Sequence, residues 1–390
     1  RYVDSSEAAE HWDVYASMFG GIPTAEIDEM SEFWTAFPAL KKALFTESGI
    51  PYVNVSTPDI KSAIKSHPDV VGFENAFNAA FSTFPAFLKE ELIDRMGSIE
   101  ISKAETVLSA DIFDRLKEIP LIDKYAAFQL LDDDWTGISI DLEMLQTEGF
   151  AATKKVDPNL VIKKKDGKDQ EVQEGWVGHI IPFDLVQVTL LSTETDELHG
   201  LESRLAEIPS EYESILDEMT EEDKESCNDV LTEEGDAFVP KEVSKKIKEL
   251  KKDRSPESVA LRTLLEKVES LVKSEKEIKA EIKAKSAALQ AKTKDTIESL
   301  SDEQALDLLE KKWIAPLIES IHKLPDTVID SLVSQIQALQ NKYATTFFEV
   351  EQQISETEAT LSGMIDDLEG NEYDMLGLNE LKKLLGGSAE

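Results

Sequence analysis

Apolar side chains recur at helical spacing along most of this chain. A first stripe lies between Glu26 and Leu44 and consists of Ile27, Met30, Phe33, Trp34, Phe37 and Leu40. A second stripe is aromatic and consists of Phe73, Phe77, Phe81, Phe84 and Phe87. Because such stripes are usually the buried face of a helix, both are predicted to be core. Residues 1–105 are therefore predicted to form a helical region.

The helical pattern continues from residue 106 but is interrupted by a β pattern. The β-prone run 160–162 leads through Asp166-Gly167 to a second β-prone run that contains Val172, Trp176 and Val177. Asp-Gly between such runs is typical of a tight turn, because glycine adopts positive φ at low steric cost. We predict a small β-hairpin near 159–181, within a region 106–182 that is otherwise helical.

Two long heptad seams follow, and they predict an arm made of two antiparallel helices over residues 183–300. The first seam consists of Leu198, Leu201, Leu205, Ile208, Tyr212, Ile215 and Met219. The second consists of Leu261, Leu264, Val268, Leu271, Glu275, Ile278, Ile282, Lys285 and Leu289. Two amphipathic helices joined by a reversal are expected to fold back on each other in a coiled-coil-like hairpin.

The last region, 301–390, is predicted to be a helical tail. Its longest stripe is expected on a single helix and consists of Ile336, Leu339, Tyr343, Phe347, Val350, Ile354, Thr357, Leu361, Met364 and Leu368. A short leucine-rich helix, 376–385, is expected to follow. A stripe of this length is expected to pack on the arm, on a copy of itself or on another protein. The predicted fold class is therefore mainly α.

Charge is unevenly spread over the chain, whose net charge is −38. Residues 194–236 hold 17 acidic residues against Arg204 and Lys224, a local balance of −15. Residues 241–300 hold 16 basic against 11 acidic residues, a local balance of +5. We expect the opposite charges to favour pairing of the two long helices, while the seam supplies the stability.

The strongly acidic total argues against nucleic-acid binding by the chain as a whole. One basic cluster is a possible contact to the DNA backbone, and it consists of Lys245, Lys246, Lys248, Lys251, Lys252 and Arg254. A simpler interpretation, which we favour, is that these side chains complement the acidic helix or lie in solvent.

Motifs of catalytic chemistry are missing. The phosphate-binding patterns GxGxxG and GxxxxGK are absent, as is the Pro-Pro pair that amino-methyltransferases use to hold the target amine. His179 lies in an apolar run and is interpreted as a satisfied, partly buried imidazole, and Cys227 among acids is expected to be a poor nucleophile. Asp132-Asp133-Asp134 is interpreted as a turn or cap before Trp135 rather than a cation site. No catalytic, cofactor-binding or metal-binding residue is predicted.

Bulk features predict a cytoplasmic piece of a longer protein. No apolar run reaches the roughly 20 residues that span a bilayer, so no membrane association is expected. A single cysteine suits a reducing compartment. The chain begins at Arg1 instead of a methionine.

Several segments resemble, in order, the C-terminal part of the modification (DNA methyltransferase) subunits of type I restriction-modification systems. They are RYVD at 1–4, GGIPTAEIDEMSEFWTAFPALKKALF at 20–45, LIDKYAAFQLL at 121–131 with Trp135, GHIIPFDLV at 178–186, KYATT at 342–346, DDLEG at 366–370 and GLNEL at 377–381. One departure is Asp134, where the family pattern has an aromatic residue.

The resemblance implies a parent enzyme that transfers a methyl group from S-adenosylmethionine to adenine N6 and works in a complex with a DNA-reading specificity subunit and a restriction subunit. The family's catalytic domain is missing from this chain, so no enzyme activity and no cofactor are expected here. The resemblance also implies that the C-terminal helices pack on the specificity subunit, and that DNA is bound through the complex.

We therefore hypothesise an assembly region that docks the modification subunit onto the specificity subunit. The residues expected at that interface are Tyr343, Phe347, Val350, Ile354 and Leu361. One alternative is an acidic coiled-coil scaffold that self-associates through the same stripes. Another is an auxiliary DNA contact through the basic cluster 245–254. Catalysis by this chain alone is not expected.

Overall fold

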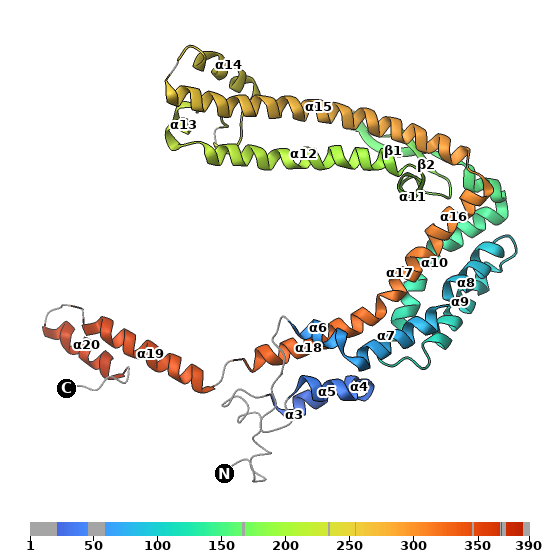
Figure 1. Ribbon diagram of the computed structural model, residues 1–390, viewed down its shortest axis with the longest axis horizontal. Helices are drawn as coiled ribbons and strands as arrows, with labels where there is room; N and C mark the ends of the chain where they lie inside the picture. Colours follow the sequence, from blue (N-terminus) through green and yellow to red (C-terminus); the bar gives the residue numbers. More distant parts are fainter. Residues whose placement is uncertain are drawn as a thin grey trace, which may run out of the picture. The chain divides into compact units, whose positions relative to one another are not determined.

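The computed structural model describes residues 22–45, 59–165, 168–232, 235–253, 255–344, 347–366, 368 and 372–384 (Figure 1). The described residues are 78% helical and include a small two-stranded antiparallel sheet, which confirms the predicted mainly α fold with a β-hairpin. It divides into two compact units. The first consists of Arg1–Glu90, Glu100–Thr136 and Pro316–Glu390, and the second of Glu91–Ile99 and Gly137–Ala315. Each unit is thus assembled from segments that are separated in the sequence.

The helices that contribute to the first unit are mostly short. In chain order they are α3 (Thr24–Glu29), α4 (Ser31–Ala36), α5 (Pro38–Leu44), α6 (Ile60–Ser66), α7 (Pro68–Phe81), α8 (Phe84–Leu88), α9 (Ile101–Arg115), the first half of α10 (Lys124–Glu148), α17 (Ala315–His322), α18 (Leu324–Lys342), α19 (Phe347–Asp366) and α20 (Glu372–Leu384). A π-helical turn, η2 (Lys89–Asp94), follows α8. Pro38 and Pro68 stand at the first positions of α5 and α7, where the missing N–H costs no hydrogen bond.

The two N-terminal stripes form core, as predicted. Trp34, Phe37 and Phe73 are buried in one cluster, in which the rings of Phe37 and Phe73 meet edge to face at 5.6 Å. Phe77 and Phe81 are fully buried and stack at 4.7 Å. Phe87 is half-buried against Phe84.

Helix α18 completes this core and corrects the prediction of a single long tail helix. Its residues Ile329 and Ile336 are fully buried in the same cluster as Ile60 and Ile64 of α6. Lys65 donates to Asp326 across the contact at 2.5 Å. The helix ends at Lys342, and α19 begins at Phe347. The first part of the predicted stripe is therefore core of the first unit, because its apolar face meets α6 within the chain.

The three aspartates before Trp135 do not form the predicted turn or cap. They lie within α10, where Gln129 donates to Asp133 at 2.8 Å, one helical turn away. Asp132 and Asp133 are exposed, so their helix position buries no charge. Partial burial, and then the charge of Asp133, raise the pKa of Asp134.

The second unit contains the β-hairpin and the long helices. After the second half of α10 and a 3-10 turn, η3 (Phe150–Lys154), come β1 (Val156–Lys165), β2 (Lys168–Gly178), α11 (Phe183–Leu190), α12 (Ser192–Glu218), α13 (Glu221–Ser226), α14 (Pro240–Leu250), α15 (Pro256–Glu298) and α16 (Asp302–Trp313). β1 and β2 pair antiparallel from Val156↔Gly178 to Lys165↔Lys168, with an irregularity between Pro158 and Leu160. The predicted Asp166-Gly167 turn lies outside the described residues.

Helices α12 and α15 run side by side as the predicted arm (Figure 1). Its end distal to the hairpin is closed by a small core that α12, α15 and α14 share, with Val230, Leu265 and Val268 fully buried. Near the hairpin, Leu289 and Ile297 of α15 are buried. The distal core contains Ile215 and Met219 of the first predicted seam and Val268 and Leu271 of the second, so the two seams meet each other within the chain.

Opposite charges meet along the arm, as expected from the uneven charge pattern. Lys267 of α15 contacts Glu218 of α12 at 3.2 Å, Lys285 contacts Glu197 at 2.6 Å, and Lys292 contacts Glu194. The partners advance along α15 while they recede along α12, so the pairing is antiparallel. Exposed pairs of this kind contribute little stability each, and they select the register instead.

Candidate protein-docking surface

Helix α19 presents large apolar side chains to solvent. Val350, Ile354, Leu361 and Met364 are 41%, 53%, 44% and 62% exposed. Their spacing of three, four and seven residues places them on one face of the helix. Most large apolar side chains among the described residues are buried or half-buried, so a continuous exposed stripe indicates a surface that another molecule covers.

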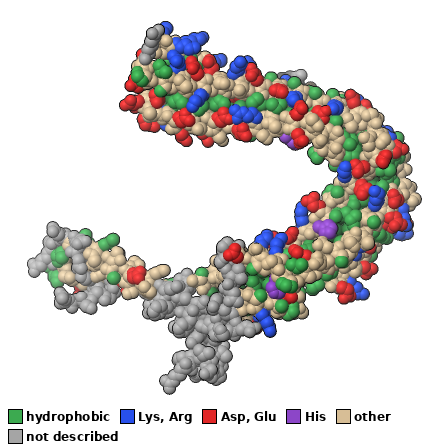
Figure 2. All heavy atoms as spheres, viewed as in Figure 1, with side chains coloured by type: hydrophobic (Ala, Val, Ile, Leu, Met, Phe, Trp, Pro, Cys, Tyr) green, Lys and Arg blue, Asp and Glu red, His purple; other side chains and the backbone are tan. Residues whose placement is uncertain are grey.

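Helix α20 enlarges this exposed apolar surface. Tyr373 is 84% exposed, and Leu376 and Leu381 are also exposed. The two helices contact each other, and Ile365 is buried near the end of α19. Figure 2 shows hydrophobic side chains on the visible surface of both helices. The sequence indicated a short leucine-rich helix here, but it did not distinguish these residues from ordinary core.

Three of the five residues expected at a partner interface lie on this exposed stripe: Val350, Ile354 and Leu361. The side chain of Phe347, which begins α19, lies outside the described residues. Tyr343 lies elsewhere. It is half-buried against the core of the first unit and donates from its hydroxyl to Glu26.

The contacts of Tyr343 identify it as a tether within the first unit. Lys342 also donates to Glu26, at 2.6 Å. Burial alone would raise the pKa of Glu26, but the hydrogen bonds from Lys342 and Tyr343 hold that pKa below its ordinary value. Burial, and then the hydrogen bond to Glu26, raise the pKa of Tyr343. The end of α18 is thereby fastened to α3.

The basic cluster 245–254 divides into paired and unpaired side chains. Lys245 contacts Glu242 of its own helix at 2.8 Å, and Lys246 contacts Asp229 at 3.0 Å. Lys248, Lys251 and Lys252 are exposed and make no ion pair with another described residue. Arg254 lies outside the described residues. Both parts of the simpler interpretation, pairing with acids and exposure to solvent, therefore occur in this cluster.

His179 is a satisfied imidazole at the base of the hairpin, as interpreted from the sequence. Its Nδ1 lies 2.6 Å from Asp157 Oδ2, and its Nε2 lies 3.1 Å from Glu148 Oε1. The hydrogen bond with Asp157 raises the pKa of His179, burial opposes this, and the hydrogen bond with Glu148 adds to the rise. With a carboxylate at each ring nitrogen, His179 connects α10 to β1. We define these three residues as the His179 clamp.

A second polar contact holds the segment after His179. Asp141 is buried and accepts from the indole Nε1 of Trp313 at 2.7 Å. Lys312 donates to Asp141 and also to the carbonyl oxygen of Ile180 at 2.6 Å. Gly178 is required here, because a Cβ at this position would lie 1.7 Å from the carbonyl oxygen of Ile181. The GHIIPF segment is therefore a structural junction.

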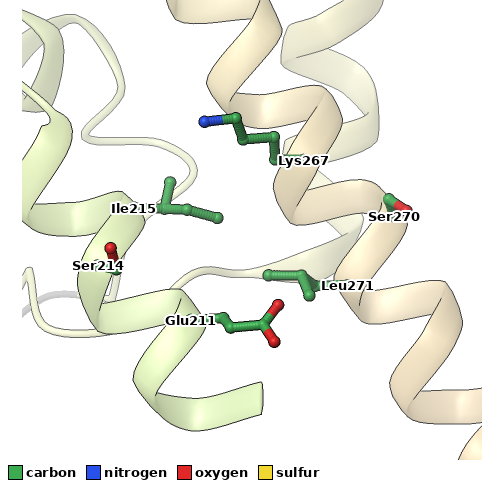
Figure 3. A pocket seen from close by; sticks show the side chains of 6 residues that line it. All are labelled: Glu211, Ser214, Ile215, Lys267, Ser270 and Leu271. Atoms are coloured by element: carbon green, nitrogen blue, oxygen red, sulfur yellow. The ribbon is translucent and has the colours of Figure 1, made fainter. Parts of the chain in front are cut away.

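The hollows of the arm are lined by groups that suit packing. One, of about 380 Å³, lies between α12 and α15. In Figure 3, Glu211 and Ile215 extend from α12 toward α15, while Lys267 and Leu271 extend from α15 toward α12. A larger hollow, of about 670 Å³, lies between the hairpin and α15, where Lys294 sits 5.1 Å from the ring centre of Trp176.

Within the described part of the chain, no three His, Cys, Asp or Glu side chains gather closely enough to hold a metal ion. Cys227 is fully buried. None of the described helices combines the length and the apolar character that crossing a bilayer requires.

The chain matches no known protein-family model, no curated protein and no solved structure.

Proposed function

We propose that this chain is an assembly region whose C-terminal helices α19 and α20 dock onto another polypeptide. The observation that carries the proposal is the exposed stripe of Val350, Ile354, Leu361 and Met364 on one face of α19. Covering such side chains stabilises a complex by about 1.5–3 kcal/mol for each one that becomes fully buried. A water-exposed stripe of this kind is costly unless a partner covers it.

The resemblance of the chain to type I modification subunits supplies the partner. In that family the C-terminal helices of the modification subunit pack on the specificity subunit. We therefore propose that α19 and α20 hold the modification subunit on the specificity subunit, and that the adenine-methylating activity, the S-adenosylmethionine and the DNA contact belong to the assembled parent complex with its restriction subunit.

The test is co-purification of the 390-residue chain with the specificity subunit of its own system. In the variant Ile354→Asp with Leu361→Asp, both side chains lie on the stripe, seven residues apart. A matched control, Gln352→Asp with Ala359→Asp, adds the same charges at the same spacing on the opposite, exposed face. We expect the stripe variant to weaken binding by about 100-fold or more, and the control to bind like wild type.

Both variants are expected to keep the helical circular-dichroism signal, because the substituted side chains are already exposed. Normal binding by the stripe variant contradicts the proposal. Light scattering on the chain without any partner adds a second criterion. A stable dimer that the stripe variant abolishes would favour the self-associating scaffold instead.

A further inference from the structure

The exposed stripe of α19 has the geometry of a helix-binding seam. Val350, Ile354, Thr357, Leu361, Met364 and Leu368 are spaced by four and three residues in alternation. This is the heptad repeat, in which side chains of one helix insert between four side chains of a facing helix. The matching occupant is therefore another amphipathic helix.

The two helices that carry this exposed apolar surface are acidic. Residues 347–384 contain ten acidic residues and two basic ones, Lys382 and Lys383. Glu358 directly follows the seam residue Thr357, which places it at the e position, where coiled coils form salt bridges to a partner. On α20, Glu380 shares a face with the exposed Tyr373 and Leu376, because the three lie at positions i, i+3 and i+7. Neither glutamate makes an ion pair with a described residue.

The arm of the same chain indicates how such acids are used. There the acidic helix α12 is paired with α15, whose lysines 267, 285 and 292 reach Glu218, Glu197 and Glu194. A second copy of α19 and α20 would bring the same acids together, and like charges at a contact are unfavourable. A basic partner avoids this repulsion.

We infer that the helix covering α19 and α20 flanks its own apolar stripe with lysine or arginine, which contact Glu358 and Glu380. This inference rests on the proposed function and adds the chemistry of the partner surface. It gives the contact two separable parts. The apolar seam supplies most of the affinity, and the acidic flank sets the partner, its register and the salt dependence.

Salt separates a basic partner from a purely apolar one. Affinity for the specificity subunit is measured by calorimetry at about 0.05 M and about 0.5 M NaCl. Because added salt screens exposed ion pairs, we expect binding to weaken by about tenfold. Added salt does not weaken apolar contacts in this way, so an affinity that stays constant or rises with salt overturns the inference.

Charge reversal locates the effect. The variant Glu358→Lys with Glu380→Lys is expected to bind about tenfold more weakly at low salt and to lose the salt dependence. The control, Glu356→Lys with Glu213→Lys, changes the net charge equally at exposed positions outside the seam, and we expect it to behave like wild type. Equal weakening by the two variants would indicate a diffuse charge effect and overturns the inference.

The outcomes also separate this inference from the proposed function. If the stripe variant Ile354→Asp with Leu361→Asp abolishes binding while the charge variants do not weaken it, the proposed docking function is supported and the inference of a basic partner helix is contradicted. If wild type does not bind the specificity subunit at low salt, both fall.

Discussion

The arm and the C-terminal helices α19 and α20 both carry heptad seams on helices rich in acidic residues, but they satisfy these seams differently. In the arm, the seam residues Leu261 and Val268 of α15 are buried in a core shared with α12 and α14, and lysines of α15 contact the acids of α12. On α19 the equivalent positions Ile354 and Leu361 are about half exposed. The same sequence pattern is thus covered by another helix of the chain in the arm, whereas on α19 it is exposed to solvent.

A heptad seam indicates that another helix will cover it, and the charge of the residues beside the seam indicates the charge of that partner helix. The arm contains its own basic partner, with a balance of +5 over residues 241–300. In α19 and α20 acidic residues dominate instead, because residues 347–384 contain ten acidic and two basic residues. The first two tests compare a position with a matched position elsewhere, and the expected effects decrease from the first test to the last.

The largest expected effect is the loss of stability on truncating a leucine in the arm. Leu265→Ala removes a fully buried side chain, which should destabilise the arm by about 2–5 kcal/mol. Leu361→Ala, the matched change in the tail, should cost less than about 0.5 kcal/mol, because that side chain already faces water. Urea unfolding with hydrogen exchange of each region measures both. A large cost for Leu361→Ala would mean that the free chain already covers the stripe.

Glycine substitutions compare the junction after β2, at Gly178, with the middle of helix α12, at Gly200. Gly178→Ala places a Cβ against the carbonyl oxygen of Ile181, and the turn must shift, at a cost of about 1–3 kcal/mol. Gly200→Ala on α12 meets no atom within 4 Å and should stabilise by about 0.5–1 kcal/mol. Thermal unfolding shows whether each variant is less or more stable than the wild type. Stabilisation by Gly178→Ala would contradict the tight junction.

A smaller effect is expected from the polar contact between the arm helices. The hydroxyl of Tyr212 donates to Glu275 of α15 at 3.2 Å, and burial together with that carboxylate raises the pKa of Tyr212 to about 12. Tyr212→Phe keeps the ring against Phe238 and removes the hydroxyl, which should cost about 0.5–1.5 kcal/mol. The urea midpoint of the arm measures this. An unchanged midpoint would mean that the seam alone sets the pairing.

The smallest expected effect is a pH dependence at the base of the hairpin. The folded pKa of His179 is raised above its ordinary value of 6.5, so its stabilisation is complete below that pH and is lost as pH rises through the folded pKa. The pKa of Glu148 is lowered by hydrogen bonds from Lys155 and then His179, so its contribution is lost as pH falls through the lowered pKa.

The urea midpoint of the second unit should therefore decrease as the pH is raised from neutral to alkaline. The variant His179→Gln isolates the contribution of the clamp, because the other histidines remain. We expect the difference between wild type and variant to shrink as pH rises. A difference that stays constant with pH would contradict the clamp.

Much of the fold follows from local periodicity. The aromatic stripe from Phe73 to Phe87, the hairpin around Asp166-Gly167 and the two seams of the arm are all patterns within a few dozen residues, and the structure contains the elements they predict. Asp132–Asp134 was misinterpreted because three short polar residues favour turns, whereas the long apolar face of α10 keeps them helical.

Long-range pairing was beyond the reach of these patterns. Tyr343 carried the same periodic signal as Ile354, but it contacts Glu26, 317 residues away, and so belongs to the core edge of the first unit. The exposed Tyr373 and Leu376 were also not identified, because apolar periodicity predicts a face that will be buried and does not specify whether the covering surface lies in the same chain.

The discontinuous construction of the first unit has a consequence during synthesis on the ribosome. Lys65 cannot pair with Asp326 until a further 261 residues have been synthesised, and the isoleucines of α6 cannot be buried against α18 until then. At roughly 5–20 residues per second, this interval lasts on the order of 13–50 s. The arm closes over much shorter separations, such as the 49 residues between Glu218 and Lys267. The apolar faces of the nascent N-terminal helices therefore remain exposed while the arm folds. We expect a chaperone to bind these faces until α18 has been synthesised.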